Sequence, residues 1–370
     1  MKHLQIQSNQ EDYPVWIGES VAQAIAELTK LPKAIVFIDA NVDRLYTATL
    51  APLKAKFPFC LVTATEEEKS LEGMKRCLDF MQSHNCTKAD RIIAIGGGIV
   101  QDLISFAAHI YYRGLKWILV PTTLLSMGDS CIGAKSGLNL NSFKNQIGAF
   151  HAPESIYICS EFIQTLTDAD IASGYGEIFK LFLVGGGDYP IRLQGLLAGG
   201  LRQAPAADLI FDSLWIKKRH IEEDEYDVGI RRYLNYGHTF GHALESIVDH
   251  EIPHGLAVVF GIDLINFLAQ RWGILSAARY ENLHRWITEQ FGFRLSKSVT
   301  ADALINKAKR DKKVVDGRLN LALLADNPKA LQGGDHPTML LKPITFEGEI
   351  HALLQEYLQG PAKDCFHLAG

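Results

Sequence analysis

The sequence predicts an α/β N-terminal domain followed by a mostly α-helical C-terminal domain. Through residue 150, short apolar runs alternate with segments of helical spacing, which is typical of a parallel sheet covered by helices. Beyond Pro153, long helical patterns replace this alternation, and a chain of 370 residues is long enough for about two domains. We therefore expect a first domain over residues 1–155 and a second over residues 156–370.

The elements expected in each domain follow from the period of the apolar residues. In the first domain, buried strands are expected at residues 34–40, 59–64, 91–98 and 117–123, with helices at residues 71–81 and 99–112. In the second domain, helices are expected at residues 168–183, 206–223, 234–248, 255–272 and 275–291, and residues 319–324 are strand-like.

Composition excludes several classes of function. The chain has 37 Lys and Arg residues against 42 Asp and Glu residues, so it lacks the basic excess typical of nucleic-acid binders. The longest apolar run, from Leu256 to Leu268, is interrupted by Asp263 and is too short to span a membrane. Six cysteines without a close CxxC pair indicate free thiols in a reducing compartment. We expect a cytoplasmic enzyme with no nucleic-acid or membrane partner.

Three consecutive glycines, Gly96–Gly98, stand between an expected strand and an expected helix. Glycine permits a sharp turn, and the N–H groups at a helix N-terminus can hold a phosphate. A tight turn without a ligand explains these glycines equally well. Asp102, one turn into the helix, is explained simply by the helix dipole. A second triple glycine, Gly185–Gly187, follows a helical segment and is expected to end it.

Histidines and a glutamate form the next candidate group. His238 and His242 are four residues apart on one helical face, and His254 begins the next helical pattern. Upstream, Glu177 and Lys180 share a face of another helix. One Glu and two His ligands are typical of a catalytic zinc site. Two histidines with this spacing are more often a surface pair or a satisfied core pair, and spacing does not decide between these interpretations.

Polar side chains gather in the segment from Met127 to Phe150, which is rich in glycine and which we interpret as a polar loop over a site. Further cations, Lys217 and Arg231, flank an acidic stretch, and another pair lies in Asp311–Lys313. Separated cations in an acidic chain suit an anionic substrate such as a phosphate or carboxylate. For any single lysine, a solvated surface position is the simpler explanation.

Taken together, these motifs resemble the sugar phosphate cyclase family, and within it the 3-dehydroquinate synthase group. The resemblance covers residues from about Asp39 to Leu324 and rests on ordered segments: GGGIVQDLISFAA, YYRG, VPTTLLSMGDS, GAKSGLN, FKNQIGAF, GEIFK, LNYGHTFGHALE and HGLAVVFG. It implies an α/β N-terminal dinucleotide-binding domain that holds NAD, a mostly α-helical C-terminal metal-binding domain that holds Zn²⁺ or another divalent ion such as Co²⁺, and a homodimer.

The resemblance also assigns roles to individual residues. It implies that the metal ligands are Glu177, His238 and His254. It implies that the residues around NAD are Asp39, Asn41, Glu66, Lys69, Gly97, Gly98, Asp102, Thr122, Thr123, Asp129, Lys144 and Thr165. It implies that the residues around the substrate are Lys135, Asn145, Lys180, Lys217, Arg231, Asn235, His242 and Lys313, with Arg113 reaching the substrate phosphate of the partner subunit.

The implied reaction converts 3-deoxy-D-arabino-heptulosonate 7-phosphate to 3-dehydroquinate and phosphate. It proceeds by transient oxidation with NAD, phosphate elimination, reduction, ring opening and aldol closure, and His242 is expected to handle a proton or bind a hydroxyl. Retention of Arg231, Asn235 and His242 favours this substrate over those of relatives acting on glucose 6-phosphate or sedoheptulose 7-phosphate. An aminated cyclase of secondary metabolism and a metal-dependent polyol dehydrogenase are the alternatives. The chain departs from the usual HGE pattern, since Leu256 follows Gly255.

Overall fold

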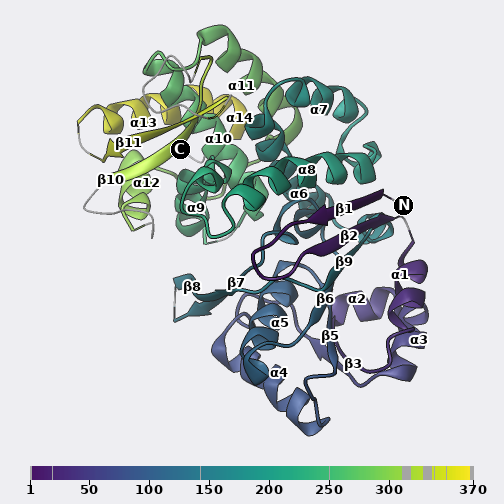
Figure 1. The fold of residues 1–370 in the computed structure, drawn as a ribbon. Helices are drawn as coiled ribbons and strands as arrows, with labels where there is room; N and C mark the ends of the chain where they lie inside the picture. Colours follow the sequence, from purple (N-terminus) through teal and green to yellow (C-terminus); the bar gives the residue numbers. More distant parts are fainter. Residues whose placement is uncertain are drawn as a thin grey trace. The chain divides into compact units, whose positions relative to one another are not determined.

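The computed structural model describes residues 2–18, 20–141, 143–249, 251–310, 318–327, 336, 338–346 and 348–366. It divides into two compact units, whose elements are labelled in Figure 1. Unit 1 comprises Met1–Thr167 and Pro205–Tyr226, and unit 2 comprises Asp168–Ala204 and Asp227–Gly370. This division differs from the expected boundary at residues 155 and 156. The reason is that β9 (Ser155–Cys159) pairs with β2 and β6, and α8 (Ala206–Glu223) packs on β1 and β2.

Within the described residues, the main sheet of unit 1 has seven strands in the order β1-β2-β9-β6-β5-β3-β4. Only β1 is antiparallel to its neighbour. Besides β9, the strands of this sheet are β1 (Lys2–Ile6), β2 (Tyr13–Gly18), β3 (Ala34–Asp39), β4 (Phe59–Val62), β5 (Arg91–Gly96) and β6 (Trp117–Pro121). The expected strands β3, β4, β5 and β6 are confirmed, whereas β1, β2 and β9 were not predicted.

Helices cover both faces of this sheet. They are α1 (Val21–Leu28), α2 (Ala40–Leu45), α3 (Thr47–Lys56), α4 (Leu71–Ser83) and α5 (Gly98–Ile110), in addition to α8. In Figure 1, α1, α2 and α3 lie on one side of the sheet, and α4 and α5 lie on the other. Because both faces are covered, the central strands are continuous apolar runs that are buried almost throughout, as in AIVFI and IIAI.

The segment expected to be a polar loop is largely structured, so that prediction is wrong. A short π-helical turn (Ser126–Ser130) is followed by an antiparallel hairpin of β7 (Lys135–Leu140) and β8 (Phe143–Phe150). The register pairs Lys135 with Phe150, and strand pairing satisfies backbone groups that a loop would leave to water. The alternating side chains of KSGLNL are the pattern that predicts a strand here.

Unit 2 is built around α10 (His254–Arg271), which packs against α6, α9, α11, α13 and β10. Its side chains are buried on all faces, which explains why its sequence is apolar all round. The other elements are α6 (Asp168–Gly185), α7 (Tyr189–Leu197), α9 (His238–Ile247), α11 (Ala277–Phe291), α12 (Ala301–Ala308), α13 (Glu349–Gln359), α14 (Pro361–Phe366), β10 (Arg318–Leu324) and β11 (Met339–Thr345).

Two glycine positions set helix ends in unit 2. Helix α6 ends at Gly185, and Gly186 and Gly187 both have positive φ, which confirms the expected stop. The helix expected from residue 234 begins instead at His238, because Gly237 adopts φ 79° and separates α9 from a preceding 3₁₀ helix (Ile230–Asn235).

No helix among the described residues is long and apolar enough to cross a membrane. None of the six cysteines is in a disulfide, as the sequence predicted.

Candidate active site

The carboxyl ends of three neighbouring strands of unit 1 bring together residues that are far apart in sequence. β6, β5 and β3 are adjacent and parallel, and they end at Pro121, Gly96 and Asp39. The chain runs from β3 outward to β4, and from β5 in the opposite direction to β6. The order therefore reverses between β3 and β5, and such a reversal is where open α/β sheets bind ligands.

Polar groups and glycines occupy these strand ends. Asp39 caps α2 by accepting a hydrogen bond from the backbone N–H of Asn41 at 2.8 Å. A Cβ added at Gly98, the first residue of α5, would meet no atom within 4 Å, whereas one at Gly97 would contact Thr123. Thr122 is buried and donates its N–H to the carbonyl of Gly96. The N-terminus of α5 is therefore open beside Gly98, where an anion could approach the backbone.

Lys69 and Asp102 form an ion pair, with Nζ and Oδ2 2.5 Å apart; Lys69 is buried and the Asp102 side chain is 20 % exposed. Burial raises the pKa of Asp102 above its ordinary value, and the charge of Lys69 offsets only part of this effect. The simple explanation of Asp102 as a helix-dipole acid is therefore incomplete, because an exposed acid in the first turn would not carry this cost.

Asn139 links the segment around Glu66 to the β7–β8 hairpin. Its side-chain amide donates to Glu66 Oε1 at 2.9 Å, and its backbone N–H donates to the carbonyl of Lys69 at 2.8 Å. Its Oδ1 accepts the backbone N–H of Asn145, while Lys144 Nζ lies 3.8 Å from Glu66 Oε1. Asn139 belongs to the polar segment from Met127 to Phe150, and the sequence did not predict this bridging position.

Other assigned residues of unit 1 lie in separate places. Lys217, on α8, contacts Asp129 with Nζ 2.5 Å from Oδ1 and 2.6 Å from its carbonyl oxygen. Thr165 shares a hydrogen bond of 3.2 Å with the hydroxyl of Tyr46, directly after α2. Lys135 is exposed at the start of β7.

In unit 2, glycines let three helices approach at backbone distance. A Cβ added at Gly255 on α10 would lie 1.8 Å from the carbonyl oxygen of Ser173 on α6, and one at Gly176 would lie 2.4 Å from that of Gly255. At Gly237, which has φ 79°, a Cβ would lie 2.6 Å from the carbonyl oxygen of Val258 on α10. Each of these glycines is the direct neighbour of an expected metal ligand, so close packing positions the ligands.

Glu177, His238 and His254 lie together. Glu177 Oε1 is 3.2 Å from Nε2 of His254 and 3.6 Å from Nε2 of His238, and only 2 % of Glu177 is exposed. Ligand atoms about 2.1 Å from a tetrahedral ion are separated by about 3.4 Å. The donor types and their spacing therefore fit a divalent metal ion such as Zn²⁺.

A second set of donors overlaps the first. The ligand atoms of His238, His242 and His254 all lie within 4.8 Å of one another, and His242 is exposed. Lys180 Nζ lies 2.5 Å from Glu177 Oε2, so the oxygen that faces the imidazoles is the other one, Oε1. Arg231 is buried in the 3₁₀ helix that ends at Asn235. Lys313 lies outside the described residues.

Glu245 is a further residue of this cluster, and the sequence did not single it out. Its Oε2 lies 3.0 Å from Nδ1 of His254. Burial disfavours a charged imidazole, but hydrogen bonds to Glu177 and Glu245 outweigh it and raise the pKa of His254 to about 10 in the metal-free chain. The spacing of His238 and Glu245, seven residues or about two helical turns, is the signal that could have identified it.

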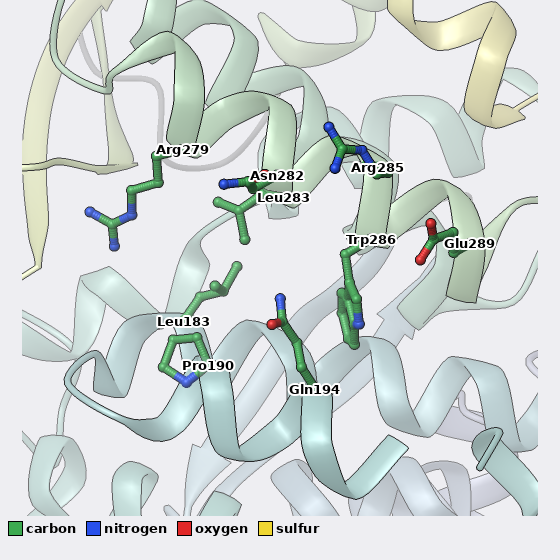
Figure 2. A pocket seen from close by; sticks show the side chains of 9 residues that line it. All are labelled: Leu183, Pro190, Gln194, Arg279, Asn282, Leu283, Arg285, Trp286 and Glu289. Carbon is green, nitrogen blue, oxygen red and sulfur yellow. The ribbon is translucent and has the colours of Figure 1, made fainter. Parts of the chain in front are cut away.

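A cavity of about 380 Å³ lies elsewhere in unit 2, between α6, α7 and α11. Figure 2 shows its lining residues: Leu183, Pro190, Gln194, Arg279, Asn282, Leu283, Arg285, Trp286 and Glu289. None of the residues assigned from the sequence lines this cavity.

Solved structures with the same fold define the class of protein. A 2-epi-5-epi-valiolone synthase from Streptomyces hygroscopicus subsp. jinggangensis 5008, solved with NAD⁺ and Zn²⁺ bound, is 26% identical. The match covers 95% of this chain and 98% of that one, with a TM-score of 0.80. A 2-deoxy-scyllo-inosose synthase complexed with carbaglucose-6-phosphate, NAD⁺ and Co²⁺ matches with a TM-score of 0.79 at 19% identity, covering 97% and 99% of the two chains. The fold is that of the sugar phosphate cyclases.

Sequence comparison identifies the family. Residues 59–173 match the 3-dehydroquinate synthase N-terminal family, and residues 174–314 match its C-terminal family. A 3-dehydroquinate synthase from Teredinibacter turnerae is 33% identical over 362 residues, which are 93% of this chain and 98% of the relative. Another, from Helicobacter pylori strain G27, is 33% identical over 76% of this chain and 81% of the relative. The chain belongs to the 3-dehydroquinate synthase family and is an enzyme of that family.

Proposed function

We propose that this chain is a 3-dehydroquinate synthase, which converts 3-deoxy-D-arabino-heptulosonate 7-phosphate to 3-dehydroquinate and phosphate in the shikimate pathway. The observation that carries the proposal is the convergence of Glu177 Oε1 on the Nε2 atoms of His238 and His254. The names of curated relatives at 33% identity support the same reaction. The proposed cofactors are NAD and a divalent metal ion, Zn²⁺ or Co²⁺.

When bound, the metal would polarise a substrate hydroxyl, and NAD⁺ would take up a hydride and later return it, so that no net oxidation occurs. Glu177, His238 and His254 would hold the metal. NAD would be held by Asp39, Gly97 and Gly98 at the strand ends and by the Lys69–Asp102 pair, in which Asp102 lies on α5. The remaining NAD residues proposed are Asn41, Glu66, Thr122, Thr123, Asp129, Lys144 and Thr165.

The substrate carries a phosphate and a carboxylate, and each unit supplies cations that we propose for these anionic groups. Lys180, Lys217 and Arg231 are all buried, so water screens their charges poorly, and the carboxylates of Glu177 and Asp129 already partner Lys180 and Lys217. Lys135, Asn145 and Asn235 would add hydrogen bonds to the substrate. His242 is exposed beside the other two histidines and can bind a hydroxyl or move a proton at its imidazole.

We further propose a homodimer in which Arg113 contributes to the site of the partner subunit. Tyr112 and Arg113 have φ values of 50° and 63°, and Gly114 follows at 117°. Two consecutive bulky residues in the left-handed region are costly, and such strain is more often kept where a side chain has a function. The mass of the chain in solution, measured by light scattering, tests the dimer. A monomer at assay concentrations would contradict it.

The test of the reaction is phosphate release from 3-deoxy-D-arabino-heptulosonate 7-phosphate in the presence of NAD⁺ and Zn²⁺. We expect release without accumulation of NADH, and we expect Glu177→Ala to abolish it, because the metal loses its only carboxylate ligand. Exposed Glu251→Ala is the matched control and should leave release unchanged.

The same assay separates the alternatives. Equal phosphate release from sedoheptulose 7-phosphate or glucose 6-phosphate would overturn the substrate assignment in favour of another cyclase. Steady accumulation of NADH with a polyol and excess NAD⁺, without phosphate release, would show a dehydrogenase instead.

A further inference from the structure

The two histidines of the metal cluster differ in what holds the nitrogen that faces away from Glu177. Nδ1 of His238 lies 3.2 Å from the backbone carbonyl oxygen of Tyr236. Nδ1 of His254 lies 3.0 Å from Oε2 of Glu245, a carboxylate that is 7 % exposed. One imidazole is thus held by a neutral acceptor and the other by a charged one.

Both acceptors fix the same tautomer. A carbonyl oxygen and an ionised carboxylate can only accept a hydrogen bond, so each ring must carry its proton on Nδ1 when neutral. The lone pair is then on Nε2 in both rings, and both Nε2 atoms face Glu177 Oε1. A carboxylate behind an imidazole also makes the ring a stronger electron donor than a carbonyl does.

The helices explain why Glu245 reaches His254. Glu245 lies seven residues after His238 on α9, so both side chains lie on the same face about two turns apart. Gly241, between them on α9, allows close approach to α10, since a Cβ there would lie 2.8 Å from the carbonyl oxygen of Ala257. One face of α9 therefore presents a metal ligand and the acceptor for a second ligand on α10.

We propose that Glu245 is a positioning residue that fixes the orientation and tautomer of His254 and makes His254 the stronger of the two histidine ligands. The proposal rests on the metal site of the proposed function. It does not depend on which sugar phosphate the enzyme converts.

The first test is the affinity of the full chain for Zn²⁺, measured by competition with a chelator. Glu245→Ala should weaken binding by about 10- to 100-fold, because His254 loses its acceptor. Glu245→Gln, which keeps an acceptor oxygen but loses the charge, should weaken binding less. The matched control is Glu251→Gln, since this exposed carboxylate lies three residues before His254 and bonds Ser296 instead. Binding by Glu245→Ala as tight as in the unmodified chain would overturn the proposal.

A second test distinguishes positioning from a general loss of structure. In the Co²⁺-loaded protein, proton NMR should show one exchangeable, strongly shifted N–H signal for each histidine ligand. In Glu245→Gln, the His254 signal should shift and exchange faster with water, whereas the His238 signal, held by the Tyr236 carbonyl, should not change. Equal changes in both signals would indicate a merely structural role and would overturn the proposal.

These outcomes are separable from those of the reaction assay. If the unmodified chain binds Zn²⁺ and the Glu245 variants behave as expected, but no phosphate is released, the proposed reaction fails and the role of Glu245 stands. If phosphate is released and the Glu245 variants bind Zn²⁺ normally, only the role of Glu245 fails. If the unmodified chain binds no divalent metal, both are overturned.

Discussion

The metal cluster of unit 2 and the strand-end region of unit 1 are positioned by different physical means. In the cluster, three helices touch at backbone distance through Gly176, Gly237 and Gly255, and each ligand is next to such a contact. At the strand ends, the order of the sheet brings the polar groups together, and charged side chains such as those of the Lys69–Asp102 ion pair hold them. The cluster should therefore be most sensitive to added volume, and the strand-end region to lost charge.

The largest effect is expected for Gly255→Ala. The new Cβ would lie 1.8 Å from the carbonyl oxygen of Ser173, so α6 and α10 must move apart. Overpacking of this kind costs about 3 kcal/mol in the free energy of unfolding. Because the ligands separate with the helices, Zn²⁺ affinity should fall by about 100-fold or more. This loss is larger than the one expected for Glu245→Ala, since Glu245 contacts a ligand and not the metal. Urea unfolding and chelator competition measure the two effects.

The control for this variant is Gly195→Ala on α7. A Cβ there meets no atom within 4 Å, and Gly195 is exposed within a helix. The variant should therefore have a free energy of unfolding about 0.5 kcal/mol higher and should bind Zn²⁺ normally. Unchanged Zn²⁺ affinity in Gly255→Ala would show that backbone packing does not position the ligands.

The charge-based region is tested by the Lys69–Asp102 pair. Removing one partner in Asp102→Ala leaves the other charge buried and should cost about 3 kcal/mol of stability, whereas the double variant Lys69→Met, Asp102→Leu should be nearly neutral. Urea unfolding measures this difference. NAD⁺ binding, measured by calorimetry, should be weakened in both variants, because both lose the polar groups beside α5. A double variant as unstable as the single one would contradict this interpretation.

The sequence predicted the parts of the molecule that local pattern controls. Apolar runs located β3, β5 and β6 within two residues of their observed ends. The apolar period located α8 and α10 within one residue of their observed ends. The pattern missed β1 and β2, because only part of their side chains are buried and β2 pairs with β9, which is distant in sequence. It also missed Glu245. Its spacing from His238 indicates only that the two share a face of α9, and the contact with His254 depends on how closely α9 and α10 approach.

Two aspartates of unit 1, Asp90 and Asp102, differ in how their surroundings shift the carboxyl pKa. Asp90 accepts hydrogen bonds from the N–H and hydroxyl of Thr87 and from Lys33. Burial raises the pKa of Asp90, but these hydrogen bonds outweigh it and lower the pKa overall. At Asp102, burial raises the pKa by more than the charge and hydrogen bond of Lys69 lower it, so the pKa is raised overall. Asp90 therefore has the environment of a structural carboxylate, and Asp102 that of a residue kept at an energetic cost.

We expect Asp90→Asn to lower the free energy of unfolding by about 2 kcal/mol at pH 7. Since the pKa of Asp90 is lower in the folded state, its contribution is complete well above the unfolded value of about 3.9 and is lost as the pH falls through the folded value. The difference between Asp90→Asn and the unmodified chain should therefore shrink in urea unfolding between pH 5 and pH 3. A difference that is constant over this range would exclude the carboxylate as its source.

The smallest effect on stability is expected for Gly98→Ala, and it separates two uses of glycine. At Gly255 the missing Cβ makes room for a helix, but at Gly98 a Cβ would meet no protein atom within 4 Å. The free energy of unfolding should therefore change by less than about 0.5 kcal/mol, since alanine is accepted in the first turn of a helix. If the open N-terminus of α5 receives the pyrophosphate of NAD⁺, the added methyl group should weaken NAD⁺ binding while Zn²⁺ binding is unchanged. Normal NAD⁺ affinity in this variant would place the phosphates elsewhere, because a methyl group at this position could not avoid a bound anion that contacts the backbone.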